Sequence, residues 1–259
     1  MTDLTVDRNA PVFTVTIDRP KANAIDSETS RGLGEAFVEF RDDQKMRVAI
    51  ITGAGDRFFS AGWDLKAAAK GEEYEADYGI GGFGGFPELP NLNKPVIAAV
   101  NGSAVGGGFE LVLAADLVVS AEHAEFFFGE LAAGVIPDAG TVRLPRVVSP
   151  ALAKELILTG RRLSATEAKI LGLINRVVGG NDLMASAADL AEEICRGAPL
   201  AVEAVLSVMR QTSQMSVQQA LDAMREGRVA EYSAMLESDD AKEGPRAFAQ
   251  GRDPVWRGS

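Results

Sequence analysis

Two glutamates stand where a carboxylate can do acid–base chemistry. Glu110 lies in the first turn of a predicted helix after a glycine triplet at 106–108, and Glu130 follows Gly129 and the aromatic run 126–128. Apolar surroundings raise the pKa of a carboxyl group, and two carboxyls in different environments can divide the roles of acid and base. Each also has a simpler interpretation: Glu110 could merely complement the helix dipole, and Glu130 could be a solvated loop carboxylate.

Two glycine-containing segments could bring backbone N–H groups to a ligand. The triplet at 106–108 leads into a helix and leaves its N–H groups uncrowded, which suits a phosphate, carboxylate or oxyanion. The second segment, 58–65, follows a predicted strand and contains Ala61-Gly62, which permits close approach of a ligand to the main chain.

A third glycine-rich segment, 79–84, formally satisfies G-x-G-x-x-G but lacks the preceding strand and following helix of a dinucleotide site. We interpret it as a mobile loop. Its phenylalanines, Phe83 and Phe86, together with Tyr78, would suit a lid over an apolar or cationic acyl group.

The composition excludes several other kinds of site. The chain has one histidine, His123, and one cysteine, Cys195, so it cannot build a Cys/His zinc site or an internal disulfide. A Ser-His-Asp triad would need His123, whose Ala-Glu-His-Ala context predicts a surface turn. We therefore expect no metal, and assign acid–base work to carboxylates, lysine or tyrosine.

The net charge and the hydropathy of the chain limit the classes of partner that it can bind. The net charge of −11 disfavours nucleic acid and anionic membranes. The most apolar stretch, 96–121, is interrupted by Asn101, Glu110 and Asp116, and the first four residues lack the basic and apolar regions of a secretory signal. We expect a cytoplasmic protein that binds neither nucleic acid nor membrane.

The predicted strands and helices that must position these residues indicate an α/β domain. Apolar or alternating runs predict strands, a helix is predicted at 27–41, and the alternation through about residue 180 favours mainly parallel pairing. The predicted strands are 12–17, 48–52, 95–100, 117–119 and 125–128. Beyond Pro199, residues 200–211 and 217–236 show only helical spacing. This segment is too small for its own core and should pack on another surface, such as a neighbouring subunit.

Taken together, six segments resemble the crotonase, or enoyl-CoA hydratase/isomerase, family over essentially the whole chain. They are 18–24, 59–65, 94–102, 106–110, 158–162 and 243–248. The resemblance implies a spiral of strand–strand–helix turns with an all-helical C-terminal trimerisation region. It places the core with its acyl-CoA site at 1–197 and the helical oligomerisation region at 198–259, and implies a homotrimer or a dimer of trimers.

The same resemblance implies a hydro-lyase that adds or removes water at C2–C3 of an acyl-CoA. It places the oxyanion hole at the N–H groups of Trp63 and Gly107 and the two catalytic carboxyls at Glu110 and Glu130. No separate cofactor is implied, because coenzyme A is part of the substrate. The positions that match coenzyme A contacts, largely through backbone, are Lys21, Ala22, Ala24, Ala61, Asp64, Leu65 and Lys66.

Within the family, segments 19–26, 59–68 and 252–256 are most similar to the branch that interconverts carnitinyl-CoA and crotonobetainyl-CoA. The alternatives are a general short-chain enoyl-CoA hydratase, an enoyl-CoA isomerase, which needs one carboxylate, and a non-catalytic acyl-CoA-binding protein.

Three features depart from the family pattern. The segment 137–144 appears one residue short, and Asp138 stands where many hydratases have glycine. The segment 250–252 lacks a lysine that can meet the coenzyme phosphate, for which Arg246 or Arg252 could substitute.

Overall fold

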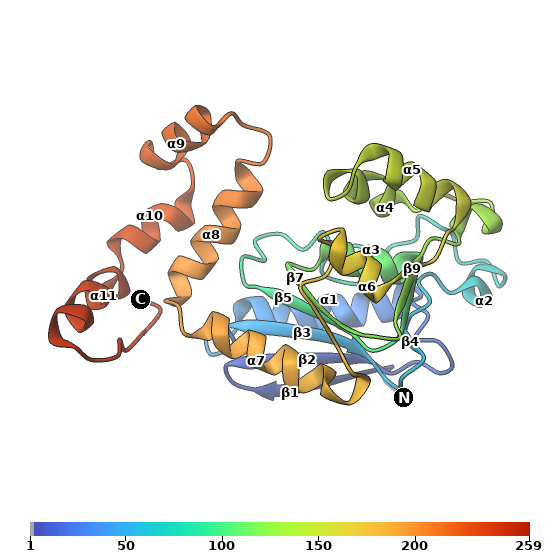
Figure 1. Cartoon of the computed structure of the whole chain (residues 1–259), viewed down its shortest axis with the longest axis horizontal. Coiled ribbons are helices and arrows are strands. Elements are labelled where there is room, and N and C mark those ends of the chain that lie inside the picture. Colours follow the sequence, from blue (N-terminus) through green and yellow to red (C-terminus); the bar gives the residue numbers. More distant parts are fainter. Residues whose placement is uncertain (1–2) are drawn as a thin grey trace. The chain divides into compact units, whose positions relative to one another are not determined.

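The structure, a computed structural model, describes residues 3–259, which form two compact units (Figure 1). The first unit comprises the described residues up to Leu92 together with residues 96–189, and the second comprises 93–95 and 190–259. The division falls inside α7 (Leu183–Cys195), a few residues before the predicted boundary at 197/198.

A six-stranded sheet forms the centre of the first unit, in the order β1-β2-β3-β5-β7-β10. Only the β1–β2 pair is antiparallel, and the other neighbours are parallel. β3 and β5 are buried at every position, which explains their uninterrupted apolar runs. The strands are β1 (Leu4–Asn9), β2 (Val12–Ile17), β3 (Val48–Gly53), β5 (Val96–Val100), β7 (Leu117–Ala121) and β10 (Arg176–Val178).

A second, four-stranded sheet carries the segments of interest. β4 (Phe58–Ser60), β6 (Ser103–Val105) and β8 (Glu125–Phe127) are parallel neighbours, and β9 (Leu163–Ser164) pairs antiparallel with β8. Parallel strands place their carboxyl ends at one edge of the sheet. The residues that follow these three strands, at 61–63, 106–107 and 129–130, therefore lie close together.

Helices cover the sheets of the first unit. Asp26 caps α1 (Ser27–Asp42) by accepting from the Thr29 N–H, and the buried face of α1 carries Phe37 and Phe40 into the core. The other α-helices with all residues in this unit are α2 (Leu65–Ala68), α3 (Gly107–Ala114), α4 (Asp138–Arg143), α5 (Pro150–Thr159) and α6 (Ala165–Ile170). The α/β class and the mainly parallel pairing predicted from the sequence are confirmed.

The second unit is helical. Its helices after α7 are α8 (Pro199–Gln211), α9 (Val217–Arg225), α10 (Ala230–Glu237) and α11 (Asp239–Gln250). The helical spacing over 217–236 spans two helices, because the chain turns at Gly227, whose φ of +73° favours glycine. A capping box formed by Ser216 and Gln219 begins α9.

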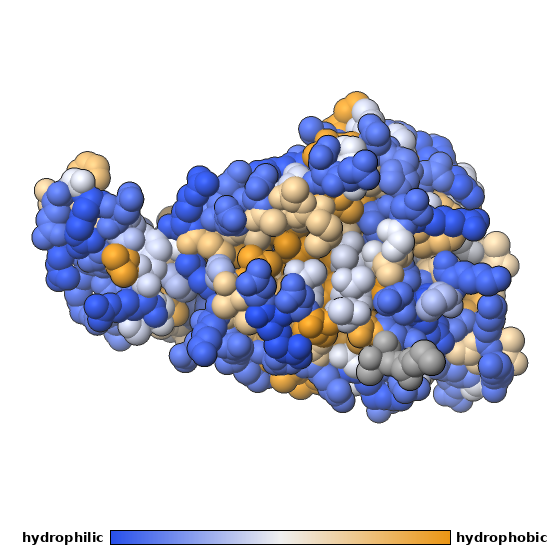
Figure 2. All heavy atoms as spheres, turned by 90° about the horizontal axis from the view of Figure 1, so that it is seen from below, coloured by the Kyte–Doolittle hydropathy of each residue, from blue (hydrophilic) through white to orange (hydrophobic). Residues whose placement is uncertain are grey.

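The face of the molecule drawn in Figure 2 is mostly hydrophilic, with groups of apolar residues between hydrophilic ones. This agrees with a chain that carries a net charge of −11. Across residues 3–259, no helix has the length and hydropathy needed to cross a membrane.

Candidate active site

Two backbone segments approach each other closely at Gly62 and Gly107. A Cβ atom on Gly62 would lie 2.6 Å from the Gly107 nitrogen and 2.7 Å from the Val105 oxygen, and the φ of Gly62 is +75°. Only glycine allows this approach. It brings the main chain of Trp63, the next residue, beside the start of α3.

The N–H groups of Trp63 and Gly107 are available to a ligand. Gly107 is the first residue of α3, so its N–H has no acceptor within the helix. Trp63 forms a bridge with Ile25 through the neighbouring Gly62 carbonyl and Asp64 N–H, which leaves its own N–H unused. Both residues line one pocket, as an oxyanion hole requires.

Glu110, in the first turn of α3, is buried, with 6% of its surface exposed. Its Oε1 accepts a hydrogen bond of 2.7 Å from the Gly140 N–H in α4. The pKa of Glu110 is raised to about 7, mainly by burial and also by the nearby carboxylates of Asp138 and Glu130, against the lowering effect of the Gly140 bond. Glu110 can therefore exchange a proton near neutral pH.

Glu130 begins a short 3₁₀ turn, Glu130–Ala133, immediately after β8. Its Oε2 accepts from the Gly129 N–H at 2.8 Å, and its Oε1 lies so close to Gly106 that a Cβ atom there would clash with it. Partial burial raises the pKa of the Glu130 carboxyl as well. The simpler interpretation, a solvated loop carboxylate, does not fit this placement.

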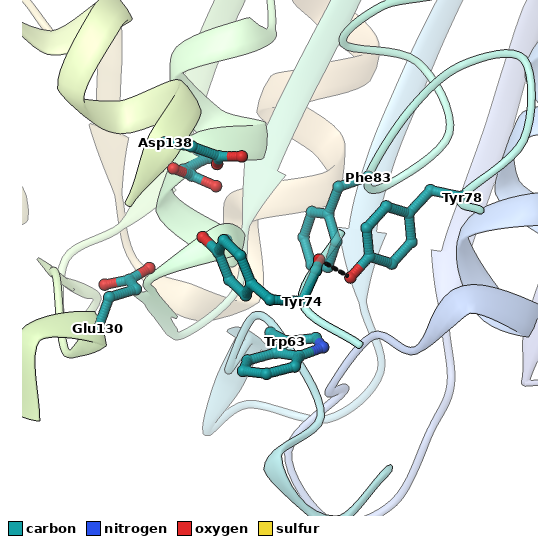
Figure 3. Close-up of a pocket in the computed structure, with 8 residues that line it drawn as sticks. Trp63, Tyr74, Tyr78, Phe83, Glu130 and Asp138 are labelled. Atoms are coloured by element: carbon teal, nitrogen blue, oxygen red, sulfur yellow. Dashed lines mark hydrogen bonds between the residues drawn. The ribbon is translucent and has the colours of Figure 1, made fainter. Parts of the chain in front are cut away.

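These groups share one pocket (Figure 3). Its lining combines backbone donors, three carboxylates and four aromatic rings, with no basic side chain among the eight residues. They are Trp63, Tyr74, Tyr78, Phe83, Gly107, Glu110, Glu130 and Asp138.

The aromatic rings form a connected wall. The rings of Trp63 and Tyr74 meet edge-on at 4.9 Å, and those of Tyr78 and Phe83 at 5.3 Å. The Tyr78 hydroxyl donates to the Tyr74 carbonyl at 2.7 Å, the bond dashed in Figure 3. Tyr74 thus lies between the carboxylates and the other rings, as the same view shows.

The glycine-rich loop differs from the sequence prediction in one respect. Phe83 lines the pocket, but Phe86 is only 4% exposed and packs on Phe37 in the core, with ring centroids 4.8 Å apart. The expectation that Phe86 belongs to a lid over the acyl group is therefore wrong.

The positions expected to contact coenzyme A lie on two chain segments, 21–25 and 61–66, that run side by side. The Ala61 N–H donates to the Ala22 carbonyl at 2.9 Å, and the Ile25 N–H donates to the Gly62 carbonyl at 2.7 Å. The expected residues differ in exposure. Lys21, Leu65 and Lys66 are exposed, Ala22, Ala24 and Ala61 are half-buried, and Asp64 is buried.

The Asp64 carboxylate is already engaged. Its Oδ2 binds Arg19 Nη1 at 2.6 Å, and its Oδ1 caps α2 by accepting from the Lys66 N–H at 2.8 Å. Arg19 also pairs with Asp26 at 2.5 Å. The Asp64 main chain is engaged as well, since its N–H donates to the Ile25 carbonyl at 2.9 Å and its carbonyl accepts from the Ala68 N–H at 3.0 Å. A coenzyme contact at Asp64 therefore stays a prediction from the family resemblance.

We also searched residues 3–259 for a metal site and for a role of the histidine. That range contains no group of three or more His, Cys, Asp or Glu side chains able to hold a metal ion. His123 is exposed, and its Nε2 lies 2.9 Å from the Asp56 carbonyl oxygen and 3.1 Å from that of Asn101.

Two members of the site were not found from the sequence. Tyr74 reaches the pocket from a segment without regular structure, and Gly140 acts only through its N–H. A glycine in the segment that follows Pro137 was a usable signal for Gly140. Nothing local marked Tyr74, whose hydroxyl binds the Ile136 carbonyl 62 positions away.

Comparisons with known proteins agree with this geometry. The enoyl-CoA hydratase/isomerase family model matches residues 7–259. A carnitinyl-CoA dehydratase from Salmonella heidelberg (strain SL476) is 55% identical over 256 residues, 98% of each chain. The crystal structure of enoyl-CoA hydratase from Mycobacterium tuberculosis H37Rv superposes with a TM-score of 0.89 at 38% identity over 100% of both chains. That of enoyl-CoA hydratase from Bacillus anthracis gives 0.90 at 34%, covering 99% of this chain and 100% of that one. The chain is a member of the enoyl-CoA hydratase/isomerase family.

Proposed function

We propose that this protein is a hydro-lyase that reversibly adds water across C2–C3 of an acyl-CoA thioester. One observation carries the proposal: Glu110 and Glu130 line the same pocket as the residues of the two free N–H groups, Trp63 and Gly107. An isomerase needs one carboxylate, and a protein that only binds acyl-CoA needs none, so the pair favours hydration and dehydration.

In this mechanism the thioester oxygen accepts hydrogen bonds from the N–H groups of Trp63 and Gly107. These fixed donors stabilise the enolate charge that develops when a proton leaves C2, and one such donor typically contributes about 10²–10³ in rate. In dehydration, one of Glu110 and Glu130 removes the C2 proton while the other protonates the departing C3 hydroxyl. In hydration, the same pair holds and activates one water molecule.

We propose carnitinyl-CoA and crotonobetainyl-CoA as the substrate pair. Two observations support this choice: the 55% identical relatives are named carnitinyl-CoA dehydratase, and the pocket is aromatic and acidic without a basic lining residue. A quaternary ammonium binds well over aromatic faces. A general short-chain enoyl-CoA hydratase is the second candidate, because the two solved structures above are named enoyl-CoA hydratase.

We further propose a homotrimer or dimer of trimers that works in the cytoplasm without a separate cofactor. The helical second unit supports the oligomer, since it exposes large apolar side chains such as Met209, Val217 and Phe248. The sequence has a single cysteine, Cys195, and so no internal disulfide, which suits a reducing compartment.

The test is a comparison of crotonobetainyl-CoA with crotonyl-CoA as substrates, followed through the loss of the enoyl-thioester absorbance. We expect hydration of both, with the larger kcat/KM for crotonobetainyl-CoA. Equal or reversed preference would favour the general hydratase, and hydration of neither would refute the hydro-lyase proposal.

A further inference from the structure

We infer that Asp138, facing the rings of Tyr74 and Trp63, forms the subsite for a quaternary ammonium at the far end of the acyl group. The inference rests on the proposed function and adds the residues that determine specificity. It starts from the pocket lining, where Asp138 is the third carboxylate and has no part in the proton transfers described above.

The Asp138 carboxylate is held at the rim of the pocket. Asp138 is the first residue of α4, and its Oδ1 accepts from the Ala139 N–H at 2.8 Å. Figure 3 shows Asp138, Tyr74 and Glu130 around the same space. The negative charge of Asp138 contributes to the raised pKa values of Tyr74, Glu110 and Glu130, so its field reaches across the pocket.

Tyr74 links the aromatic wall to this carboxylate. Its ring meets the ring of Trp63, and its hydroxyl donates to the Ile136 carbonyl at 2.6 Å, two residues before Asp138. The hydroxyl bond therefore holds the ring against the segment that carries Asp138. The result is an aromatic face on one side of the pocket and a carboxylate on the other.

The chemistry of this arrangement fits a quaternary ammonium. Such a group has no N–H to donate, so it is recognised by aromatic faces and by negative charge at van der Waals distance. A neutral acyl chain would gain nothing from the Asp138 charge, and none of the eight lining residues is a base that could pair with that charge. An ammonium on C4 would lie next to C3, where Glu110 and Glu130 act.

The experiment compares two acyl groups of the same shape, crotonobetainyl-CoA and its neutral isostere 5,5-dimethylhex-2-enoyl-CoA. We expect wild-type protein to prefer the cation in kcat/KM. Asp138→Asn should lower kcat/KM for the cation at least tenfold and change that for the isostere less than about threefold, and Asp138→Glu should retain the preference. Tyr74→Leu should also reduce the preference, whereas Tyr74→Phe, which keeps the ring, should largely retain it.

Glu73→Gln is the matched control, since it removes a negative charge beside Tyr74 from an exposed residue outside the pocket lining. It should leave the preference unchanged. An Asp138→Asn protein with unchanged melting temperature and unchanged preference would overturn the subsite while leaving the hydro-lyase proposal intact. Failure of the wild-type protein to hydrate either thioester would instead overturn both.

Discussion

The Gly140 N–H donates to Glu110 Oε1 at 2.7 Å and so connects the first turn of α4 to the first turn of α3. The bond fixes one oxygen of the carboxyl group and leaves the other for the pocket. Glycine is required at this position, because a Cβ atom would lie 2.5 Å and 2.7 Å from two ring atoms of Phe128. The segment after Pro137 thus supplies the donor that orients Glu110.

Replacing Gly140 with alanine should disturb both stability and activity. The added methyl group must displace the Phe128 ring or α4, and such overpacking costs about 1–3 kcal/mol. The shift would also loosen the bond to Glu110 and lower kcat. Urea denaturation and steady-state kinetics check both effects.

Gly244→Ala in α11 is the control, because the new Cβ would make an ordinary contact of 3.5 Å with Trp256. We expect it to change the free energy of unfolding by less than about 1 kcal/mol. Equal stability and kcat in the Gly140→Ala and wild-type proteins would contradict the role assigned to Gly140.

The raised pKa of Glu110 predicts a dependence of stability on pH. Between its ordinary pKa of 4.5 and its folded value of about 7, the folded state binds more protons than the unfolded state, so rising pH lowers stability. This contribution amounts to roughly 3 kcal/mol by pH 8. The side chain in Glu110→Gln cannot ionise, so this variant should not lose that stability as the pH rises.

The measurement is the difference in unfolding free energy between Glu110→Gln and wild-type protein at pH 5 and pH 8. We expect the unfolding free energy of the variant, relative to that of the wild type, to increase from pH 5 to pH 8. A difference that stays constant across this range would show that Glu110 is not buried as described.

The close approach of Gly62 to Gly107 predicts a large effect of Gly62→Ala on catalysis. A methyl group there would press on the Gly107 nitrogen and displace one of the two donors, so kcat should fall by about 10²-fold or more. Gly55→Ala is a matched control, since Gly55 has a similar φ of +82° but nothing within 4 Å of the new Cβ. It should carry the same backbone strain and retain kcat. Similar kcat values for the two variants would argue against the oxyanion hole.

The Arg19 cluster predicts a link between stability and coenzyme binding. Arg19 pairs with Asp26 and Asp64 and so joins the two segments expected to contact coenzyme A. Arg19→Gln leaves these half-buried carboxylates without their cation, which should cost about 1–3 kcal/mol and weaken acyl-CoA binding. Arg8→Gln, which breaks the exposed pair with Glu39, should change stability little and leave binding unchanged. Denaturation and calorimetric titration with a saturated acyl-CoA compare the two.

Much of the fold was predictable because its strands carry strong local signals. β2 alternates, and β3 and β5 are buried apolar runs, so periodicity identified them. β1 is an edge strand with mostly exposed polar residues, and β6 has only three residues, so neither has a clear pattern. Their placement depends on pairing with distant segments.

The site residues likewise fall into those that local sequence patterns marked and those that depend on distant contacts. Glu110 and Glu130 follow glycines near strand ends, so their sequence positions marked them, and the structure places both at one pocket. Tyr74 depends on a contact with residue 136, and the burial of Phe86 depends on Phe37 of α1. No local pattern encodes such long-range contacts, which is why Tyr74 was missed and Phe86 was placed wrongly.

The most direct test measures hydration by Glu110→Gln and Glu130→Gln together with the Kd of each variant for a non-reactive saturated acyl-CoA. Glutamine keeps the size of each side chain but cannot carry the proton, so both variants should lose at least about 10²-fold in kcat. Their Kd values should stay within threefold of wild type, as should all values for the exposed control Glu122→Gln. Turnover near that of the wild type in either catalytic variant would contradict the paired-carboxyl mechanism.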